Sequence, residues 1–586
     1  MQKLINILKK NWYFIFLLLI LIPSFWRMLK PGIYSTQDFH YFRLVEFDKC
    51  TQDFQIPCRW SPDAGYGYGE PLFNFYTQLS YAVGELIHLT GISIVNSLKI
   101  LFIVSLLGSG VAMYFLAKKI WNNSWSALIS AVLYIYAPYR AVDVWVRGAL
   151  PEALSFILFP LIILKIEDYF RKKKNIDLIW FGILLTLLVL THNLSVILFA
   201  PFLFCLIIYR IITAFKKTPD LKSRDELNAD MSSSFGRGNR EFKSAEDVID
   251  LGNYKLIWKI ATSFLIPIFL SAFYILPVIF ESRFINLPST IKGYFDFKGH
   301  FVTLYQLLIS RFWGYGASVF GSEDGLSLSI GNLQWLLPTI LAIWVLLKKK
   351  FRENRYLVFL VTFGWVFLFL THNKSTIIWQ LIKPMAYIQF PWRFLGVSLF
   401  IFSLAAGSIT NIVKKRTVII ASVIVLLSLA LNFSFFKEDI WYKVSDKDLT
   451  SGKRWEDQTS ASIGDYWPIF GSDLPRSIAP LDPQEGKLIE RESNKVIYSI
   501  NKKKESETIL PVVYFPGWEA YSEGQKLQIY PSGRYGLISI GSLPKGEQII
   551  ILKFSNTKVR SIGNLISVIS LGVLFLIYVK LRKDEK

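Results

Sequence analysis

Groups able to move a proton occur close together near residue 40. Asp38 and His40 lie two residues apart in the segment TQDFHYFR, residues 36–43, among bulky aromatic side chains. Apolar surroundings raise the pKa of a carboxyl group toward neutrality, and such a carboxylate suits the role of general base toward a hydroxyl group. We therefore predict that Asp38 and His40 are catalytic and that Arg43 binds substrate.

Other ionisable and aromatic residues gather at the predicted ends of membrane-spanning helices. Placing an ionisable group at membrane depth costs free energy, so the positions of these groups are informative. Arg393 opens a helix, and an arginine there adds a bidentate donor to the positive end of the helix dipole, which suits a phosphate. The alternative is that the histidines of this set are interface residues and that its arginines reach lipid headgroups. The predicted substrate-binding residues are Asp143, Arg147, Glu152, His192, His372, Trp392 and Arg393, with Arg140 in the same short loop as the first three.

A glycine-rich turn, GYGYG, occupies residues 65–69. Glycine permits close approach of a backbone, and the rings of Tyr66 and Tyr68 could stack on a sugar. We predict that both tyrosines bind substrate. The alternative is an ordinary flexible turn between helices.

These residues need a scaffold of membrane-spanning helices. The chain has 586 residues, 52% of them hydrophobic, and a mean hydropathy of +0.37, whereas a soluble chain of this length would not average apolar. A crossing helix needs about 20 apolar residues. Segment 77–91 is apolar but short, and we expect it to lie at the interface. About twelve spans are predicted, at 11–29, 97–117, 125–139, 151–169, 177–192, 194–214, 257–280, 331–347, 356–371, 391–412, 417–436 and 560–580.

The basic residues follow the positive-inside pattern of membrane proteins. The formal net charge is +21, and this pattern explains it without a nucleic acid partner. It predicts a multi-pass protein of the cell membrane with both termini in the cytoplasm. The lysines and arginines occur in runs beside the apolar segments, at 9–10, 118–119, 171–174, 348–350, 414–416 and 580–586.

Several long stretches lie outside the predicted spans. Residues 30–76 form a first outer loop, 216–254 a polar inner loop that we expect to be disordered, and 281–330 an outer loop with a short helix near 304–312. Residues 437–558 form an outer domain. The second half of this domain alternates between apolar and polar residues, which indicates an antiparallel β-sandwich. The predicted domains are a transmembrane module (1–436), this outer domain (437–558), and a last helix with a basic tail (559–586).

The chain has three cysteines. Cys50 and Cys58 fall in the first outer loop and can pair in an oxidising compartment. The sequence leaves open whether they form a disulfide or remain two free thiols. Cys205 falls in an apolar span, where we expect it to act as a small hydrophobe.

Several motifs resemble a known family. TQDFHYFR (36–43), PCRWSP (57–62) and GYGYGEPLFNFY (65–76) resemble bacterial membrane proteins named "6-pyruvoyl-tetrahydropterin synthase related", which are similar to YfhO-type proteins of the GT-C superfamily of membrane glycosyltransferases. Nothing in the sequence indicates pterin chemistry. Three further motifs fit the same pattern: RGALPE (147–152), THN (191–193) and QFPWR (389–393). PGW (516–518) and PKG (544–546) resemble the carboxy-terminal part of YfhO-type proteins.

The resemblance implies a GT-C enzyme of the inverting type, with a polyprenyl-phosphate-linked sugar as donor. The family's catalytic acid falls on Asp38. Many members carry a second acidic residue beside it, where this chain has Gln37 and His40, so either a divalent metal is held by Asp38 and His40 or no metal is used. The acceptor implied is an envelope glycopolymer, a glycolipid or a protein.

Two other functions fit part of the pattern. Twelve spans with a polar inner loop after the sixth match the two-halves plan of many secondary transporters, which would make the chain a transporter or flippase. The large outer domain before the last span breaks that symmetry, and loop 118–124 lacks a Gly-Asp-Arg-type motif. The chain could also be a non-catalytic envelope assembly protein whose outer domain binds polymer.

Overall fold

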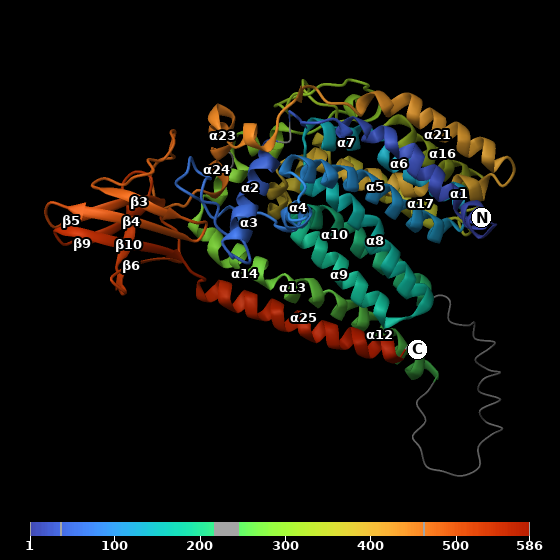
Figure 1. The fold of residues 1–586 in the computed structure, drawn as a ribbon. Helices are drawn as coiled ribbons and strands as arrows, with labels where there is room; N and C mark the ends of the chain where they lie inside the picture. The colour runs from blue at the N-terminus through green and yellow to red at the C-terminus, as the bar shows by residue number, and fades with distance from the viewer. Residues whose placement is uncertain (1, 36–37, 216–244, 461–462, 585–586) are drawn as a thin grey trace, which may run out of the picture.

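The protein consists of a body of packed helices with a β-sandwich at one end (Figure 1). The structure is a computed structural model and describes residues 2–35, 38–215, 245–460 and 463–584. Helix α1 (Gln2–Leu21) begins, and helix α25 (Lys558–Asp584) ends, on the side of the body away from the sandwich (Figure 1). This arrangement is compatible with both termini on one membrane face, and which face that is stays a prediction.

Runs of hydrophobic residues between polar turns form the helices of the body. Local caps fix some of the turns: Asn123 Oδ1 accepts hydrogen bonds from the backbone N–H groups of Trp125 and Ser126, which starts a helix there. The main helices are α5 (Ile94–Trp121), α6 (Ser124–Ile135), α8 (Leu150–Lys172), α9 (Asn175–Thr191), α10 (Asn193–Phe215), α12 (Ala245–Ser263), α13 (Leu265–Leu270), α14 (Ala272–Glu281), α16 (Asn332–Leu347), α17 (Arg355–Phe369), α19 (Phe394–Ala406) and α21 (Thr417–Asn432).

Five helices among the described residues are long and apolar enough to cross a membrane, and there are up to eight if each bent pair of helices counts as one span. The five are α5, α10, Pro391–Ile412, Thr417–Phe435 and α25. The other predicted spans fall on α1, α8, α9 and α16, whose apolar stretches are shorter or more charged. The chain is thus a helical membrane protein with several apolar helices, and the count of twelve spans stays a prediction.

Two of the predicted spans, 125–139 and 257–280, are interrupted, and a third, 356–371, ends at a bend. In the first, Pro138 begins a new helical segment, because proline lacks the backbone N–H that would continue the preceding helix. The bent pairs are Ser124–Ile135 with Pro138–Val146 (53°), Tyr254–Leu270 with Ala272–Phe284 (72°) and Arg355–Phe369 with Asn373–Leu381 (89°).

The segments between spans differ in part from expectation. Within 77–91, helix α4 (Leu79–His88) has 10 residues and a length of about 15 Å, which is too short to cross a bilayer. Residues 216–244 of the predicted disordered loop lie outside the described residues, but 245–254 are helical as part of α12, which corrects the prediction for that part. The helix expected near 304–312 is shorter, α15 (Leu304–Leu308).

Two antiparallel sheets form the sandwich predicted for the second half of the outer domain. Alternation along one strand buries Val496, Tyr498 and Ile500, which share a core with Leu510 and Val512 of the other sheet. The five-stranded sheet has the order β3 (Gly486–Arg491), β4 (Lys495–Lys502), β10 (Gly546–Phe554), β6 (Trp518–Ser522), β7 (Gln525–Leu527), and the three-stranded sheet the order β5 (Ser506–Val513), β9 (Leu537–Leu543), β8 (Ile529–Ser532). Short helices α22 (Asp446–Leu449), α23 (Gly452–Thr459) and α24 (Ile463–Tyr466) precede it.

The first outer loop pairs with the start of the outer domain. Strand β1 (Ile33–Tyr34) pairs with β2 (Trp441–Tyr442), and helix α2 (Asp38–Gln52) follows β1. Cys50 and Cys58 form a disulfide, which ties the end of α2 to the next part of the loop. The pairing that the sequence left open is therefore made.

Candidate functional site

A broken helix places three of the predicted site residues together. After α6, the chain forms α7 (Pro138–Ala141) and a π-helical turn, η3 (Val142–Val146), and then turns through Gly148, whose φ is +57°, into α8. Glycine adopts this left-handed conformation without the steric cost of a side chain. Asp143 on η3, Arg147 at its end and Glu152 in the first turn of α8 consequently face one another.

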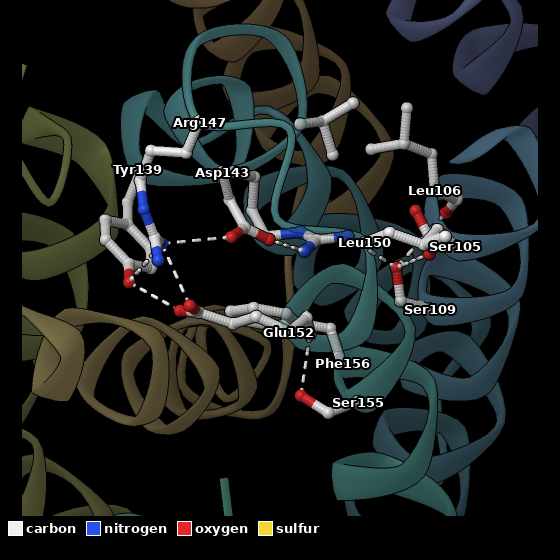
Figure 2. Close-up of polar contacts among 12 residues, drawn as sticks. Ser105, Leu106, Ser109, Tyr139, Asp143, Arg147, Leu150, Glu152, Ser155 and Phe156 are labelled. Atoms are coloured by element: carbon white, nitrogen blue, oxygen red, sulfur yellow. Dashed lines mark hydrogen bonds and ion pairs between the residues drawn. The ribbon is translucent and has the colours of Figure 1, made fainter. Parts of the chain in front are cut away.

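These residues form a charged network (Figure 2). Arg147 Nη1 donates to Glu152 Oε2 at 2.9 Å and to Asp143 Oδ1 at 3.2 Å. Tyr139 donates its hydroxyl hydrogen to Glu152 Oε1 at 2.6 Å. Two carboxylates therefore surround the Arg147 guanidinium, so that this cation is neutralised within the protein.

Arg140 forms the buried end of the network. It is fully buried. Its Nη1 donates to Asp143 Oδ2 at 3.3 Å and its Nη2 to Ser109 Oγ at 3.3 Å, and its guanidinium lies 4.0 Å from the ring centre of Phe156. Asp143 thus bridges Arg140 and Arg147, which fixes both cations relative to α8.

Trp392 and Arg393 reach the network from far along the chain. They lie on the short helix η10 (Pro391–Arg393), which leads into α19. The Arg147 guanidinium lies 4.6 Å from the ring centre of Trp392, so the indole covers one face of that cation. Trp392 Nε1 donates to Ser318 Oγ at 3.2 Å, which holds the ring in place.

Arg393 differs from the other cations in its partners. Its Nη1 donates to Ile388 O at 2.7 Å and to Gln389 Oε1 at 3.1 Å, and both acceptors are uncharged. Among the residues that the structure describes, it makes no ion pair, and its buried Nε has no hydrogen-bond partner. It is close enough to Arg147 and Glu152 for electrostatic interaction. Three arginines, Arg140, Arg147 and Arg393, therefore lie near two carboxylates, Asp143 and Glu152, and of the three arginines only Arg393 makes no direct ion pair with a described residue.

His192 also lies at this place. Its Nδ1 is 2.7 Å from Ser195 Oγ, which in turn is 2.9 Å from Ser155 Oγ on α8, and it interacts electrostatically with Glu152 and Arg393. The Thr77 hydroxyl donates to Thr191 O at 2.8 Å, which joins this corner to the first outer loop. These contacts explain the position of His192 without the role of a membrane-interface residue, which the sequence left open.

The start of α2 is anchored on the same broken helix. His40 Nε2 lies 2.5 Å from Gly148 O and its Nδ1 2.9 Å from Tyr81 Oη, and Tyr34 Oη donates to Val144 O at 2.7 Å. Burial and the nearby Arg43 lower the pKa of His40 to about 3, so the imidazole is neutral at physiological pH. His40 thus acts as an anchor between the outer loop and the turn that carries Arg147.

The side chain of Asp38, the predicted base, lies outside the described residues. Its backbone begins α2, between the two anchors Tyr34 and His40. Arg43, on the same helix, lies 4.2 Å from the ring centre of Tyr76, and Arg393 interacts electrostatically with Tyr76 as well. Arg43 and Arg393 therefore both lie near Tyr76.

Three predicted site residues are not brought to this network. His372 Nδ1 accepts a hydrogen bond from the backbone N–H of Lys374, so it caps a helical turn. Tyr66 and Tyr68 contact the outer domain: the backbone of Tyr66 bonds to Thr459 and Ala479, and the Tyr68 ring packs against Tyr535 at 5.7 Å. The glycine-rich turn places them against the sandwich, because its positive φ angles at three glycines direct the chain there.

Sequence reasoning missed some residues of the site. Tyr139 gave no signal, because a tyrosine after a proline in an apolar run is typical of a helix start. Outside the network, Glu70 follows the GYGYG turn and is fully buried, and its carboxyl oxygens have no hydrogen-bond partner among the described residues. Burial and the nearby Asp465 raise the pKa of Glu70 to about 8. A carboxyl group in a loop expected to be solvated gave no reason to suspect this.

The described residues do not supply a metal site. No group of three or more histidine, cysteine or carboxylate side chains that could hold a metal ion occurs within 2–35, 38–215, 245–460 and 463–584. Both ring nitrogens of His40 are engaged by protein groups, which disfavours it as a ligand. The predicted pairing of Asp38 with His40 around a divalent cation therefore depends on a side chain outside the described part of the chain.

The fold and the site together define a helical membrane protein with a carboxy-terminal β-sheet domain and a charged network at broken helices. Residues 73–223 match the model of a family described as "6-pyruvoyl-tetrahydropterin synthase related domain; membrane protein". This match confirms the resemblance noted in the sequence. The match contains Arg147, Glu152 and His192, and it leaves out Asp38 and Arg393.

One solved structure with similarity to the chain is that of an oligosaccharyltransferase of Archaeoglobus fulgidus, tethered to an acceptor peptide containing the NVT sequon by a disulfide bond. The sequence identity is 14% and the TM-score 0.39, and the match covers 77% of this chain and 57% of that one. The chain thus spans little more than half of that protein, and a similarity of this extent assigns no activity. A search of curated proteins finds no match.

Proposed function

We propose that the protein is a membrane glycosyltransferase that transfers a sugar from a polyprenyl-phosphate donor to an acceptor on the outer face of the cell membrane. The observation that carries the proposal is the Arg393 guanidinium, which makes no direct ion pair with a described residue and lies beside a charged network at the first turn of a long apolar helix. A partly buried cation that makes no direct ion pair, at a site where three arginines lie near two carboxylates, favours an anionic ligand. A phosphate on a lipid carrier combines such an anion with an apolar tail.

The family match and the network give the other residues their proposed roles. Arg393 binds the donor phosphate, and Arg147 adds positive charge while Asp143 and Glu152 hold it in position. Trp392 shields Arg147 from solvent on one face. His40 positions the turn at Gly148 and with it Arg147, so it is a positioning residue in this proposal.

The chemistry requires one proton transfer and one displacement. The acceptor hydroxyl attacks the anomeric carbon of the donor sugar, the bond from that carbon to the phosphate oxygen breaks, and the hydroxyl proton passes to the Asp38 carboxylate. The departing phosphate gains negative charge, which Arg393 and the first turn of its helix stabilise. The sandwich would hold or orient the acceptor, which is an envelope glycopolymer, a glycolipid or a protein.

Proteoliposomes that contain the full chain test this function. Polyprenyl-phosphate donors with labelled sugars are added with an envelope extract as acceptor, and wild type is compared with Asp38→Asn and with Asp48→Asn, a carboxylate on the same helix. We expect label in product for wild type and Asp48→Asn, and none for Asp38→Asn. A fully active Asp38→Asn variant would reject the assigned base. Label that crosses the bilayer without a new glycosidic bond would identify a transporter. If the label neither crosses the bilayer nor enters a product, the protein would be a scaffold.

A further inference from the structure

A pocket of about 740 Å³ lies between the ends of three helices, away from the charged network described above. It is lined by the last turns of α8 and α10 and by the first turn of α17. The positive-inside pattern predicts that these helix ends lie at the cytoplasmic surface of the membrane. None of the residues lining this pocket has a role in the proposed transfer.

The rim of the pocket is strongly basic. Arg171, Lys173, Arg352 and Arg355 line it, and none of them makes an ion pair with a residue that the structure describes. One carboxylate, Glu353, lies among them. Four cations against one carboxylate leave the rim positive. Arg355 also occupies the first turn of α17, where no side chain caps the backbone N–H groups, so the helix dipole adds to this charge.

The floor of the pocket contains buried donors without partners. Arg210 pairs with the fully buried Glu167, and its guanidinium lies 5.4 Å from the ring centre of Tyr356. Arg210 Nε and the Tyr356 hydroxyl are buried, and neither has a hydrogen-bond partner among the described residues. Buried donors of this kind are costly unless a ligand or water accepts their hydrogen bonds.

We infer that this pocket binds the phosphate group of an anionic lipid headgroup at the membrane surface. A phosphate oxyanion accepts several hydrogen bonds at once, which matches two orphaned donors below a ring of guanidinium and ammonium groups. Basic pockets between helix ends at the membrane surface suit such headgroups. Soluble phosphate offers the same oxyanion without the acyl chains, so the test has to separate the two sources. The inference does not rest on the proposed glycosyl transfer.

The test uses the full chain in a nonionic detergent, titrated with short-chain phosphatidylglycerol, short-chain phosphatidylcholine or inorganic phosphate and followed by calorimetry. The variant is the triple substitution Arg171→Gln, Arg352→Gln and Arg355→Gln at exposed positions. The matched control removes three equally exposed charges from the basic run outside the pocket, Lys414→Gln, Lys415→Gln and Arg416→Gln. Size-exclusion chromatography and thermal unfolding establish that both variants fold.

For wild type and the control, we expect phosphatidylglycerol to bind at least about tenfold more tightly than phosphatidylcholine. The pocket variant should lose this preference. An equal loss in the control would assign the binding to the general charge of that membrane face and overturn the inference. Inorganic phosphate binding as tightly as phosphatidylglycerol would overturn the lipid source. A pocket variant that keeps full phosphatidylglycerol affinity would reject the site.

Discussion

Arg147 and Glu152 form a 2.9 Å ion pair across the turn that separates a π-helical segment from α8. Both side chains are largely buried, with 16% and 4% of their surfaces exposed. The pair holds the charged network at the broken helix, because Arg147 also bonds to Asp143 and Glu152 also accepts from Tyr139. Its contribution to stability and its contribution to activity are separable by experiment.

A double-mutant cycle measures this pair. Arg147→Met and Glu152→Gln each leave a buried charge with fewer partners, so each single change should lower stability by about 2 kcal/mol or more. The double variant should lose less than the sum of the two, with a coupling of about 1–3 kcal/mol. Thermal unfolding in detergent gives the values. Additive losses would show that the two groups do not stabilise each other.

Substitution of Arg393 should affect the donor most. Arg393→Lys keeps the charge but loses the fork of donors, so the KM for a polyprenyl-phosphate donor should rise about tenfold with a smaller change in the KM for the acceptor. Arg311→Lys, on an exposed arginine, is the matched control and should change neither value. An unchanged donor KM in Arg393→Lys would reassign Arg393 to contact with lipid headgroups.

The link between Glu438 and the basic residues Arg27 and Lys30 should make stability depend on pH. Burial opposes ionisation of Glu438, but hydrogen bonds from Arg27 and Lys30 outweigh it and lower the pKa of Glu438 to about 2, against 4.5 for the free group. A carboxyl group with a lowered pKa in the folded state adds stability above pH 4.5, and that stability is lost as the pH falls toward 2.

Glu438→Gln removes this contribution. At pH 7, the variant should be less stable than wild type by about 1–2 kcal/mol, a value reduced by the partial exposure of both cations. The difference between the two unfolding temperatures should shrink as the pH is lowered from 5 to 3, as measured in detergent. A gap that stays constant over this range would show that the ionised carboxylate is not the source.

The disulfide between Cys50 and Cys58 should stabilise the first outer loop. Replacing both cysteines with alanine should lower stability by about 2 kcal/mol, because a short loop is no longer closed in the unfolded chain. Thiol alkylation followed by mass measurement should modify Cys205 alone before reduction and all three cysteines after it. Alkylation of all three cysteines without reductant would contradict the bond.

Cysteine labelling tests the predicted orientation. Lys504 is exposed on the sandwich and Lys415 lies in a basic run between two apolar helices. In a Cys205→Ala background, an impermeant maleimide should label Lys504→Cys in sealed right-side-out vesicles, and Lys415→Cys only after the vesicles are opened. The reverse pattern would place the sandwich in the cytoplasm and end the proposed outer-face reaction.

The sequence alone was enough to predict a helical membrane protein with a carboxy-terminal β-sheet region. Long apolar segments and flanking lysines and arginines indicate membrane helices, because crossing a bilayer constrains composition directly. Strict alternation at Val496, Tyr498 and Ile500 predicted the sandwich strand that the structure contains. The motif around Arg147, Glu152 and His192 indicated a common site, and the described contacts connect all three.

Tertiary structure alone decided which of these residues meet, and with what charge. Contacts between residues hundreds of positions apart, such as Arg147 with Trp392, depend on helix packing that no local pattern encodes. The same packing sends Tyr66 and Tyr68 to the outer domain, engages both nitrogens of His40, and leaves Arg393 without a direct ion pair among the described residues. Local composition determines where a segment can lie, whereas the partners and the compensation of its charges arise only when distant segments are brought together.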